Sequence, residues 1–155
     1  MSGSIALGAD DAGLALKDRL AAMLRDANLE VADYGCAAGE DADYPDVALA
    51  VAEAVARGEH GRAILVCGTG IGMAIAANKV PGVYAAQVHD AYSAERARKS
   101  NNAQVMTLGA RIVGPELAES LVRIWLGAEF QGGASARKVA KIAAAEARLG
   151  ADPAS

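Results

Sequence analysis

The sequence is poor in aromatic residues, has only two cysteines and contains no long apolar run. Aromatic side chains make up 4% of the 155 residues and hydrophobic residues 53%, much of it alanine, which favours closely packed helices on a sheet over a β-sandwich. No stretch approaches the roughly 18 apolar residues of a membrane span, and the N-terminus lacks the basic region of a signal peptide. We therefore expect a cytoplasmic protein that binds no membrane and keeps Cys36 and Cys67 as reduced thiols.

Dense basic clusters and metal-ligand spacings are also missing. The net charge is −4, and lysine and arginine are nowhere concentrated enough to follow a phosphate backbone, so nucleic acid is not an expected partner. The two histidines, His60 and His89, are far apart, and no spacing of His, Cys and Asp resembles a metal site. The length fits one domain over residues 1–149, with residues 150–155 as a flexible tail.

Short apolar runs alternate with longer amphipathic stretches along the chain. We expect strands at residues 4–8, 30–33, 63–66, 83–88 and 105–108. We expect helices at residues 14–26, 46–57, 73–79, 92–100, 115–126 and 135–149, the second with Asp46 as its N-cap. This order predicts an α/β fold, with a five-stranded parallel sheet and helices on both faces. In such folds ligands bind at the carboxyl ends of the strands, here the loops after residues 9, 67, 89 and 108.

The strongest local motif is a glycine-rich turn between a strand and a helix. Residues 66–72 read Val-Cys-Gly-Thr-Gly-Ile-Gly, and three glycines allow successive backbone N–H groups to converge on an anion at a helix N-terminus. The same field would stabilise the thiolate of Cys67 at the rim of this loop. The alternative is that Cys67 is a small buried hydrophobic residue and the glycines only form the turn.

The first loop carries two adjacent acids, Asp10 and Asp11, between Gly8 and Gly13. These glycines stand where a dinucleotide fingerprint has its first and third glycines, but Asp10 takes the middle position. A carboxylate there would repel a pyrophosphate, which argues against NAD. Asp10 is better suited to hold sugar hydroxyls, and the alternative is simple helix capping.

Several other polar residues have two interpretations. His60 lies in a glycine-flanked polar turn and is expected to be a solvated surface residue. His89 ends the fourth predicted strand, where it faces the site or makes a structural hydrogen bond. Arg111, Arg137 and Lys138 are candidates for phosphate binding, although solvated charge is the alternative for the last two.

Together these segments resemble the ribose-5-phosphate isomerase B / galactose-6-phosphate isomerase family over residues 5–142. The most specific stretch is residues 64–82, Ile-Leu-Val-Cys-Gly-Thr-Gly-Ile-Gly-Met-Ala-Ile-Ala-Ala-Asn-Lys-Val-Pro-Gly. Supporting matches are Asp-Tyr-Pro-Asp at 43–46, His-Asp-Ala-Tyr-Ser-Ala at 89–94, Asn-Asn-Ala at 101–103 and Leu-Gly-Ala-Arg at 108–111.

The resemblance implies a Rossmann-like three-layer sandwich and an aldose–ketose isomerase of a small sugar phosphate. It implies no metal or organic cofactor, and a homodimer, or a tetramer of paired dimers, with active sites shared between subunits. Cys67 would be the base that moves the proton between C1 and C2, and Thr69 would support it. The amides that would stabilise the enediolate belong to Gly68, Gly70, Ile71 and Gly72. The candidate substrate-binding residues are Asp10, Asp11, Tyr44, His89, Asn101, Arg111, Arg137 and Lys138.

The sequence also departs from the family pattern. Asp11 and Ser100 stand where the family usually has His, and the second of these His residues is generally assigned to opening the sugar ring. Near the C-terminus, Gly-Gly-Arg-His-x-x-Arg becomes Gly-Gly-Ala-Ser-Ala-Arg-Lys at 132–138, which puts Lys138 at the second Arg position. Residues 93–96 and 100–104 resemble the branch that acts on tetrulose 4-phosphates.

A physical reason supports this branch. Ribose 5-phosphate closes into a furanose through its free O4, whereas the O4 of erythrose 4-phosphate is esterified. An enzyme for the four-carbon substrate can therefore dispense with a ring-opening acid. Two other classes stay open: a non-catalytic sugar-phosphate-binding subunit of a heteromeric isomerase, and a nucleotide-binding dehydrogenase, which Asp10 disfavours.

Overall fold

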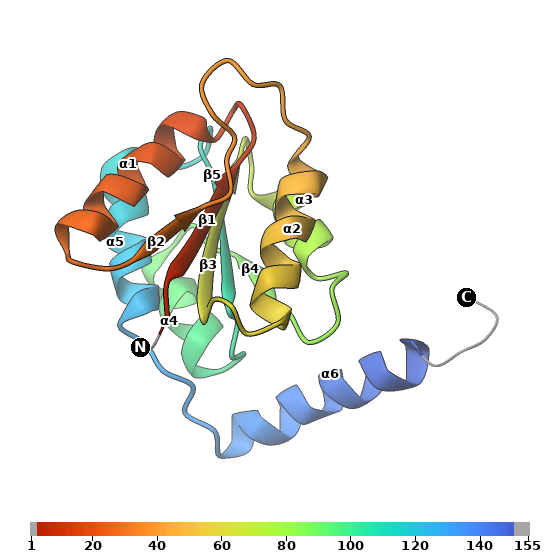
Figure 1. Cartoon of the computed structure of the whole chain (residues 1–155). Coiled ribbons are helices and arrows are strands. Elements are labelled where there is room, and N and C mark those ends of the chain that lie inside the picture. The colour runs from red at the N-terminus through yellow and green to blue at the C-terminus, as the bar shows by residue number, and fades with distance from the viewer. Residues whose placement is uncertain (1–2, 151–155) are drawn as a thin grey trace.

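The computed structural model describes residues 3–150, which form a parallel sheet between two layers of helices (Figure 1). The strands are β1 (Ile5–Ala9), β2 (Val31–Asp33), β3 (Arg62–Cys67), β4 (Ala85–Gln87) and β5 (Val105–Gly109). All strand pairs are parallel, and the order across the sheet is β2-β1-β3-β5-β4. The predicted α/β class and five-stranded parallel sheet are confirmed.

The helices divide between the two faces of the sheet. They are α1 (Leu14–Asp26), α2 (Tyr44–Ala56), α3 (Ile71–Ala77), α4 (Ala91–Lys99), α5 (Pro115–Leu126) and α6 (Ala134–Gly150). Helices α1, α4 and α5 pack on one face, in a core that includes Leu20, Leu121 and Trp125. Helices α2 and α3 cover the other, around Val51 and Met73. Within residues 3–150, no helix is both long and apolar enough to cross a membrane.

The central strands of the sheet are fully buried, and its edge strand β4 is short. All residues of β1, β3 and β5 are buried, as the continuous apolar runs predict for strands covered on both faces. The edge strand β4 is shorter than the predicted 83–88. Side chains replace the ladder at its start, because Gln104 Oε1 accepts the Tyr84 N–H and Asn78 Oδ1 accepts the Ala85 N–H, both at 2.8 Å.

The start of α2 corrects one prediction. Asp43, in extended conformation, is the N-cap, and the helix begins at Tyr44. Pro45 therefore lies in the first turn, where its fixed φ suits the helix and its missing N–H costs nothing. The predicted N-cap, Asp46, is instead an acidic residue of the first turn, where it favourably meets the positive end of the helix dipole.

Helix α6 stands apart from the sandwich (Figure 1). None of its 17 residues is buried, and Ile142 and Leu149 are 52% and 60% exposed. Glu146 Oε2 accepts the Gly82 N–H at 2.9 Å, a contact back to the body. Gly150, expected in the tail, ends this helix instead, and residues 151–155 of that tail lie outside the described part of the chain.

Candidate functional site

The chain leaves β3 through a loop that wraps the sulfur of Cys67. Cys67 is 5% exposed, and its Sγ accepts the Gly70 N–H at 3.1 Å. Thr69 Oγ1 accepts the Ile71 N–H at 3.2 Å, so the hydroxyl hydrogen of Thr69 remains available to donate. Gly70 has a φ of +78°, a left-handed conformation that glycine adopts without steric cost. The predicted glycine turn is present, and both Cys67 and Cys36 are free thiols.

Two side chains from neighbouring strands hold the carbonyl oxygens of this loop. The hydroxyl of Thr107, a fully buried residue of β5, donates to the Gly70 carbonyl at 2.8 Å. Gln87 Nε2 at the end of β4 donates to the Thr69 carbonyl at 2.7 Å. The N–H of the Thr69–Gly70 peptide unit donates to Cys67 Sγ, and that of the Gly70–Ile71 unit donates to Thr69 Oγ1. Neither residue is among the predicted site residues. Thr107 could have been found from the sequence, because it is the one polar residue in the otherwise apolar strand β5.

Arg111 follows β5 and lies against the same loop. Its backbone N–H donates to the Gly68 carbonyl at 3.0 Å. A Cβ placed on Gly68 would lie 3.5 Å from the Arg111 Nη1, so the guanidinium lies directly over the glycine. The loop and a permanent positive charge are therefore adjacent, which is the combination that a phosphate ester requires.

Tyr44 and the two acids of the first loop border this edge of the sheet. The Tyr44 ring packs on Gly72, where an added Cβ would lie 2.5 Å from the ring. Asp10 follows β1, and its Oδ1 accepts the Gly13 N–H at 3.0 Å. The N-cap of α1 is Gly13 and no side chain caps the helix, so Asp10 holds the turn that precedes the helix and the capping interpretation is wrong. Asp11 is exposed at the same end of the sheet.

His89 makes the structural hydrogen bond that was one of its two interpretations. Its Nε2 accepts the Gly109 N–H at 3.0 Å, and because an amide N–H can only donate, the ring nitrogen Nε2 is unprotonated. Gly109 ends β5 beside Cys67, its partner in the ladder. His89 thus lies at the carboxyl edge of the sheet, with one nitrogen committed to the backbone.

Three predicted site residues lie at the opposite edge of the sheet. Asn101 comes before β5, whose five residues span about 13 Å at about 3.3 Å each, whereas Cys67 pairs with the last residue of β5. Arg137 and Lys138 begin α6, and the segment leading to it is bound at this same edge through the Gln131 N–H and the Lys99 carbonyl, 3.1 Å apart. A single chain does not bring these three residues to Cys67.

His60 corrects another prediction. It is 9% exposed rather than solvated. Its Nδ1 is 2.7 Å from Ser4 Oγ and its Nε2 is 2.8 Å from the Tyr34 hydroxyl. The polar turn that contains His60 folds onto the start of β1 and the end of β2, so both ring nitrogens are satisfied inside the protein.

A doubly covered parallel sheet with an amide-lined loop and an arginine at its carboxyl edge is the architecture of an enzyme that acts on a small anionic substrate. The family model for Ribose/Galactose Isomerase matches residues 5–142, and the chain belongs to this family. The predicted isomerase class is therefore confirmed, and the dehydrogenase alternative is not supported.

Individual relatives agree with this assignment. A D-erythrulose-4-phosphate isomerase of Pectobacterium atrosepticum is 58% identical over 140 residues, covering 90% of this chain and 92% of the relative. The ribose-5-P isomerase B of Listeria innocua is 52% identical over 135 residues, covering 87% and 91%. The structure of the ribose-5-phosphate isomerase B of Clostridium thermocellum superposes with a TM-score of 0.92 at 46% identity, covering 94% of this chain and 99% of that one.

Proposed function

We propose that this protein interconverts the aldose and ketose forms of a four-carbon sugar phosphate, with Cys67 as the proton-transferring base. The observation that carries the proposal is the Cys67 sulfur in hydrogen-bond contact with the glycine loop, with the Arg111 guanidinium over the same loop. The choice of a four-carbon substrate rests on Ser100 and on relatives named D-erythrulose-4-phosphate isomerases, at 58% and 51% identity.

The chemistry follows from where charge develops. Cys67, as a thiolate, removes a proton from the carbon next to the substrate carbonyl, and the electron pair moves onto the carbonyl oxygen to give an enediolate. The Gly70 N–H donates to Cys67 Sγ and the Ile71 N–H to Thr69 Oγ1, so the donors for this oxygen are the remaining loop amides and the Thr69 hydroxyl. The Cys67 thiol then returns the proton to the former carbonyl carbon, while the hydroxyl proton of the carbon that lost it passes to the enediolate oxygen. The carbonyl group thus forms at the adjacent carbon, and the isomerisation needs no redox partner.

The substrate is anchored from both sides of this loop. Arg111 takes the phosphate, because its planar guanidinium matches phosphate oxygens and lies against Gly68. Asp10 has one carboxylate oxygen on the Gly13 N–H and offers the other to sugar hydroxyls. Tyr44 is 42% exposed at the start of α2, and its hydroxyl offers a further hydrogen bond to the sugar.

A second copy of the chain supplies the remaining contacts. Asn101, Arg137 and Lys138 are distant from Cys67 within one chain, but would meet the Cys67 of a partner in a homodimer. The support is α6, which has no buried residue along its length. Helices of this kind are marginal in water and gain stability by packing an apolar face. Exposed Ile71 and Ile75 on α3, beside the Cys67 loop, offer such a surface.

Ser100 explains why four carbons are preferred over five. It is the C-cap of α4, immediately before Asn101, and a serine hydroxyl is a poor acid at neutral pH. A furanose that must be opened would therefore lack its proton donor, at a typical cost of about 10²–10⁴-fold in that step. Erythrose 4-phosphate forms no such ring and avoids the penalty.

Turnover across a panel of substrates tests the proposal. We expect the highest kcat/KM with erythrose 4-phosphate or a tetrulose 4-phosphate, and lower values with ribose 5-phosphate, allose 6-phosphate and galactose 6-phosphate. Ser100→His should raise the five-carbon activity more than the four-carbon activity. Efficient ribose 5-phosphate turnover with no tetrose activity would contradict the substrate assignment. Binding without turnover of any of these sugars would favour the non-catalytic subunit.

A further inference from the structure

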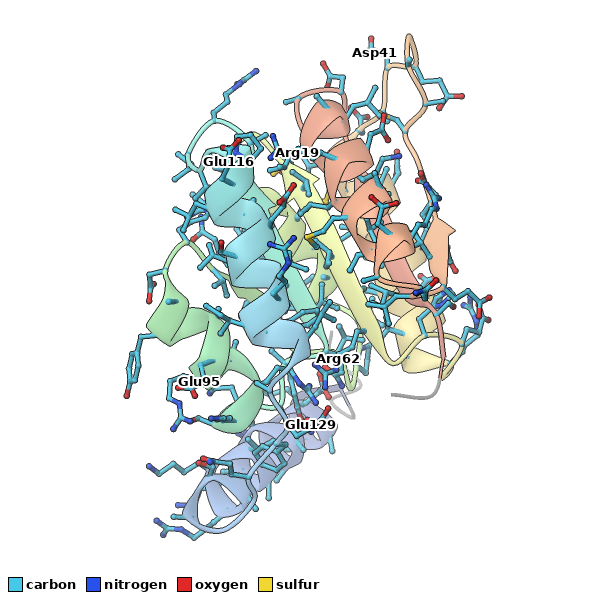
Figure 2. All side chains as sticks on the ribbon, turned by 90° about the vertical axis from the view of Figure 1, so that its left-hand side faces the viewer. Arg19, Asp41, Arg62, Glu95, Glu116 and Glu129 are labelled. Carbon is cyan, nitrogen blue, oxygen red and sulfur yellow. The ribbon has the colours of Figure 1, made fainter. Side chains whose placement is uncertain are left out.

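A polar pocket lies at the amino edge of the sheet, at the end of β3 opposite to Cys67. Its volume is about 380 Å³. It is lined by Gly3, Ser4, Ile5, Gly61, Arg62, Arg98 and Glu129. Figure 2 shows Arg62 and Glu129 side by side, below the end of α5. Because β3 separates this pocket from the Cys67 loop, it is not part of the proposed active site.

Two arginines are buried here. Arg62 is 4% and Arg98 6% exposed, although charged side chains are rarely buried without a matching partner. Arg62 donates to the carbonyls of Trp125 and Ala128, at 3.3 and 3.2 Å, and to Glu129 Oε1 at 2.9 Å. These contacts fasten the end of α5 to the start of β3.

Arg98 is less well satisfied. Its Nη1 donates to the Ala103 carbonyl at 2.9 Å, and its Nη2 is 3.9 Å from Glu129 Oε2. Its Nε is buried, with no hydrogen-bond partner among the described residues. The two guanidiniums therefore share one carboxylate, and the Glu129 side chain is itself 71% exposed. Backbone carbonyls satisfy single N–H groups but bring no full negative charge.

The charge imbalance has an electrostatic consequence. Burial lowers the pKa of Arg98 to about 10, with the nearby charge of Arg62 acting in the same direction and Glu129 opposing it. Burial also lowers the pKa of Arg62. Both shifts mean that the charged forms are held at a cost, and a further negative charge in the pocket would relieve it.

We propose that this pocket binds a small tetrahedral oxyanion of the phosphate class between Arg62 and Arg98. Guanidinium N–H groups match phosphate oxygens in geometry and charge. The free volume beside Gly3 and Gly61, which have no side chains, leaves room for the ion. The anion would supply the second negative charge that the arginine pair lacks and a partner for the N–H groups of Arg98.

The fluorescence of Trp125 reports on this pocket directly. Trp125 is the only tryptophan of the sequence, and the Arg62 Cζ lies 5.3 Å from its ring centroid. Inorganic phosphate is titrated at constant ionic strength, with chloride as the balancing anion. We expect a saturable change in emission, because an anion on Arg62 alters the field at the indole.

Three variants locate the binding. Glu129→Gln removes the carboxylate that competes with the anion and should tighten phosphate binding about threefold or more. Arg98→Met should weaken it about tenfold or more, as expected for a lost charge-assisted contact. Arg111→Ala, which alters the other edge of the sheet, should leave the Trp125 titration unchanged.

The possible results are distinct. A titration that does not saturate, or one that Glu129→Gln leaves unchanged or weakens, would overturn the proposal. Loss of the signal in Arg111→Ala would assign it to the substrate loop instead. If circular dichroism shows that Arg98→Met is unfolded, Glu129→Gln alone decides, because its side chain is exposed and its replacement leaves the packing intact. None of these readouts depends on turnover, so they stand apart from the proposed isomerisation.

Discussion

The two edges of the sheet differ in how their polar groups are held. At the carboxyl edge, the Cys67 sulfur, the Thr69 hydroxyl and the carbonyls of the glycine loop all have hydrogen-bond partners within the chain. At the amino edge, Asn101 is exposed, and Arg137 and Lys138 lie on a helix with no buried residue. One chain thus fixes the reacting group by itself, whereas the contacts proposed for Asn101, Arg137 and Lys138 depend on assembly.

Glycines show the same contrast. Gly109 lies so close to the loop that an added Cβ would be 2.7 Å from the Thr69 Cα, so a side chain there would displace the loop. Gly132 and Gly133, before α6, have positive φ values, but a Cβ added to either would meet no neighbouring atom within 4 Å. The first glycine secures a close contact, and the other two set the direction in which α6 leaves the body.

The largest expected effect is at the fixed edge. Cys67→Ala should lower kcat at least about 10³-fold, because no other group at the loop can take the carbon-bound proton. Cys67→Ser should be nearly as inactive, since a hydroxyl is a much weaker base than a thiolate. Circular dichroism should show an unchanged fold. Cys36→Ala is the matched control and should retain activity, whereas near-wild-type turnover in either Cys67 variant would sink the assignment.

The assembled edge can be tested by complementation between chains. The double variant Arg137→Ala, Lys138→Ala should lose about 10–100-fold in kcat/KM for each charge-assisted contact removed. Mixing it with Cys67→Ala should restore activity that neither variant has alone. In a mixed dimer one site combines an intact Cys67 with intact Arg137 and Lys138 from the other chain.

Sedimentation of the mixture should show dimers or tetramers, and mixing two samples of the same variant is the control. If the restored activity is absent although mixed dimers form, the two sets of residues do not serve one site. A monomer with full activity would contradict the shared site in a different way, because Arg137 and Lys138 cannot reach Cys67 within one chain.

The features that could be predicted from the sequence are those that a local pattern of residues determines. Buried strands follow from continuous apolar runs, and the Cys67 loop follows from three closely spaced glycines. Prediction from the sequence fails where a distant segment of the chain determines whether a side chain is buried. His60 sits in a polar turn, but Ser4 and Tyr34 enclose it. Nothing in the sequence around Arg62 and Arg98 distinguishes them from exposed charged residues. They are buried because the end of α5 and Glu129 pack against them.

The smallest expected effect concerns a charge pair at the carboxyl edge that, unlike the arginine pair, has matched charges. Lys17 is 2% exposed, and its Nζ donates to both carboxylate oxygens of Asp33 at 2.8 Å. Burial would raise the pKa of Asp33, but the bonds from Lys17 and the Gly35 N–H outweigh it and lower that pKa below the usual value. The pair joins α1 to the end of β2.

The sign of the pH dependence follows from this lowered pKa. The stability that Asp33 contributes is present above its unfolded-state pKa, about 3.9, and is lost as the pH falls through the lower pKa of the folded state. Asp33→Asn should reduce the free energy of unfolding at neutral pH by roughly 1–3 kcal/mol, less than for a fully buried pair because Asp33 is about a third exposed. That difference should shrink below about pH 4. Urea denaturation from pH 3 to 7, at fixed protein concentration, measures both.

Asp18→Asn is the control, since Asp18 also contacts Lys17 but is 60% exposed, and it should change stability much less. An equal loss in both variants, or a deficit in Asp33→Asn that stays constant down to pH 3, would show that the Lys17–Asp33 pair does not carry this stability.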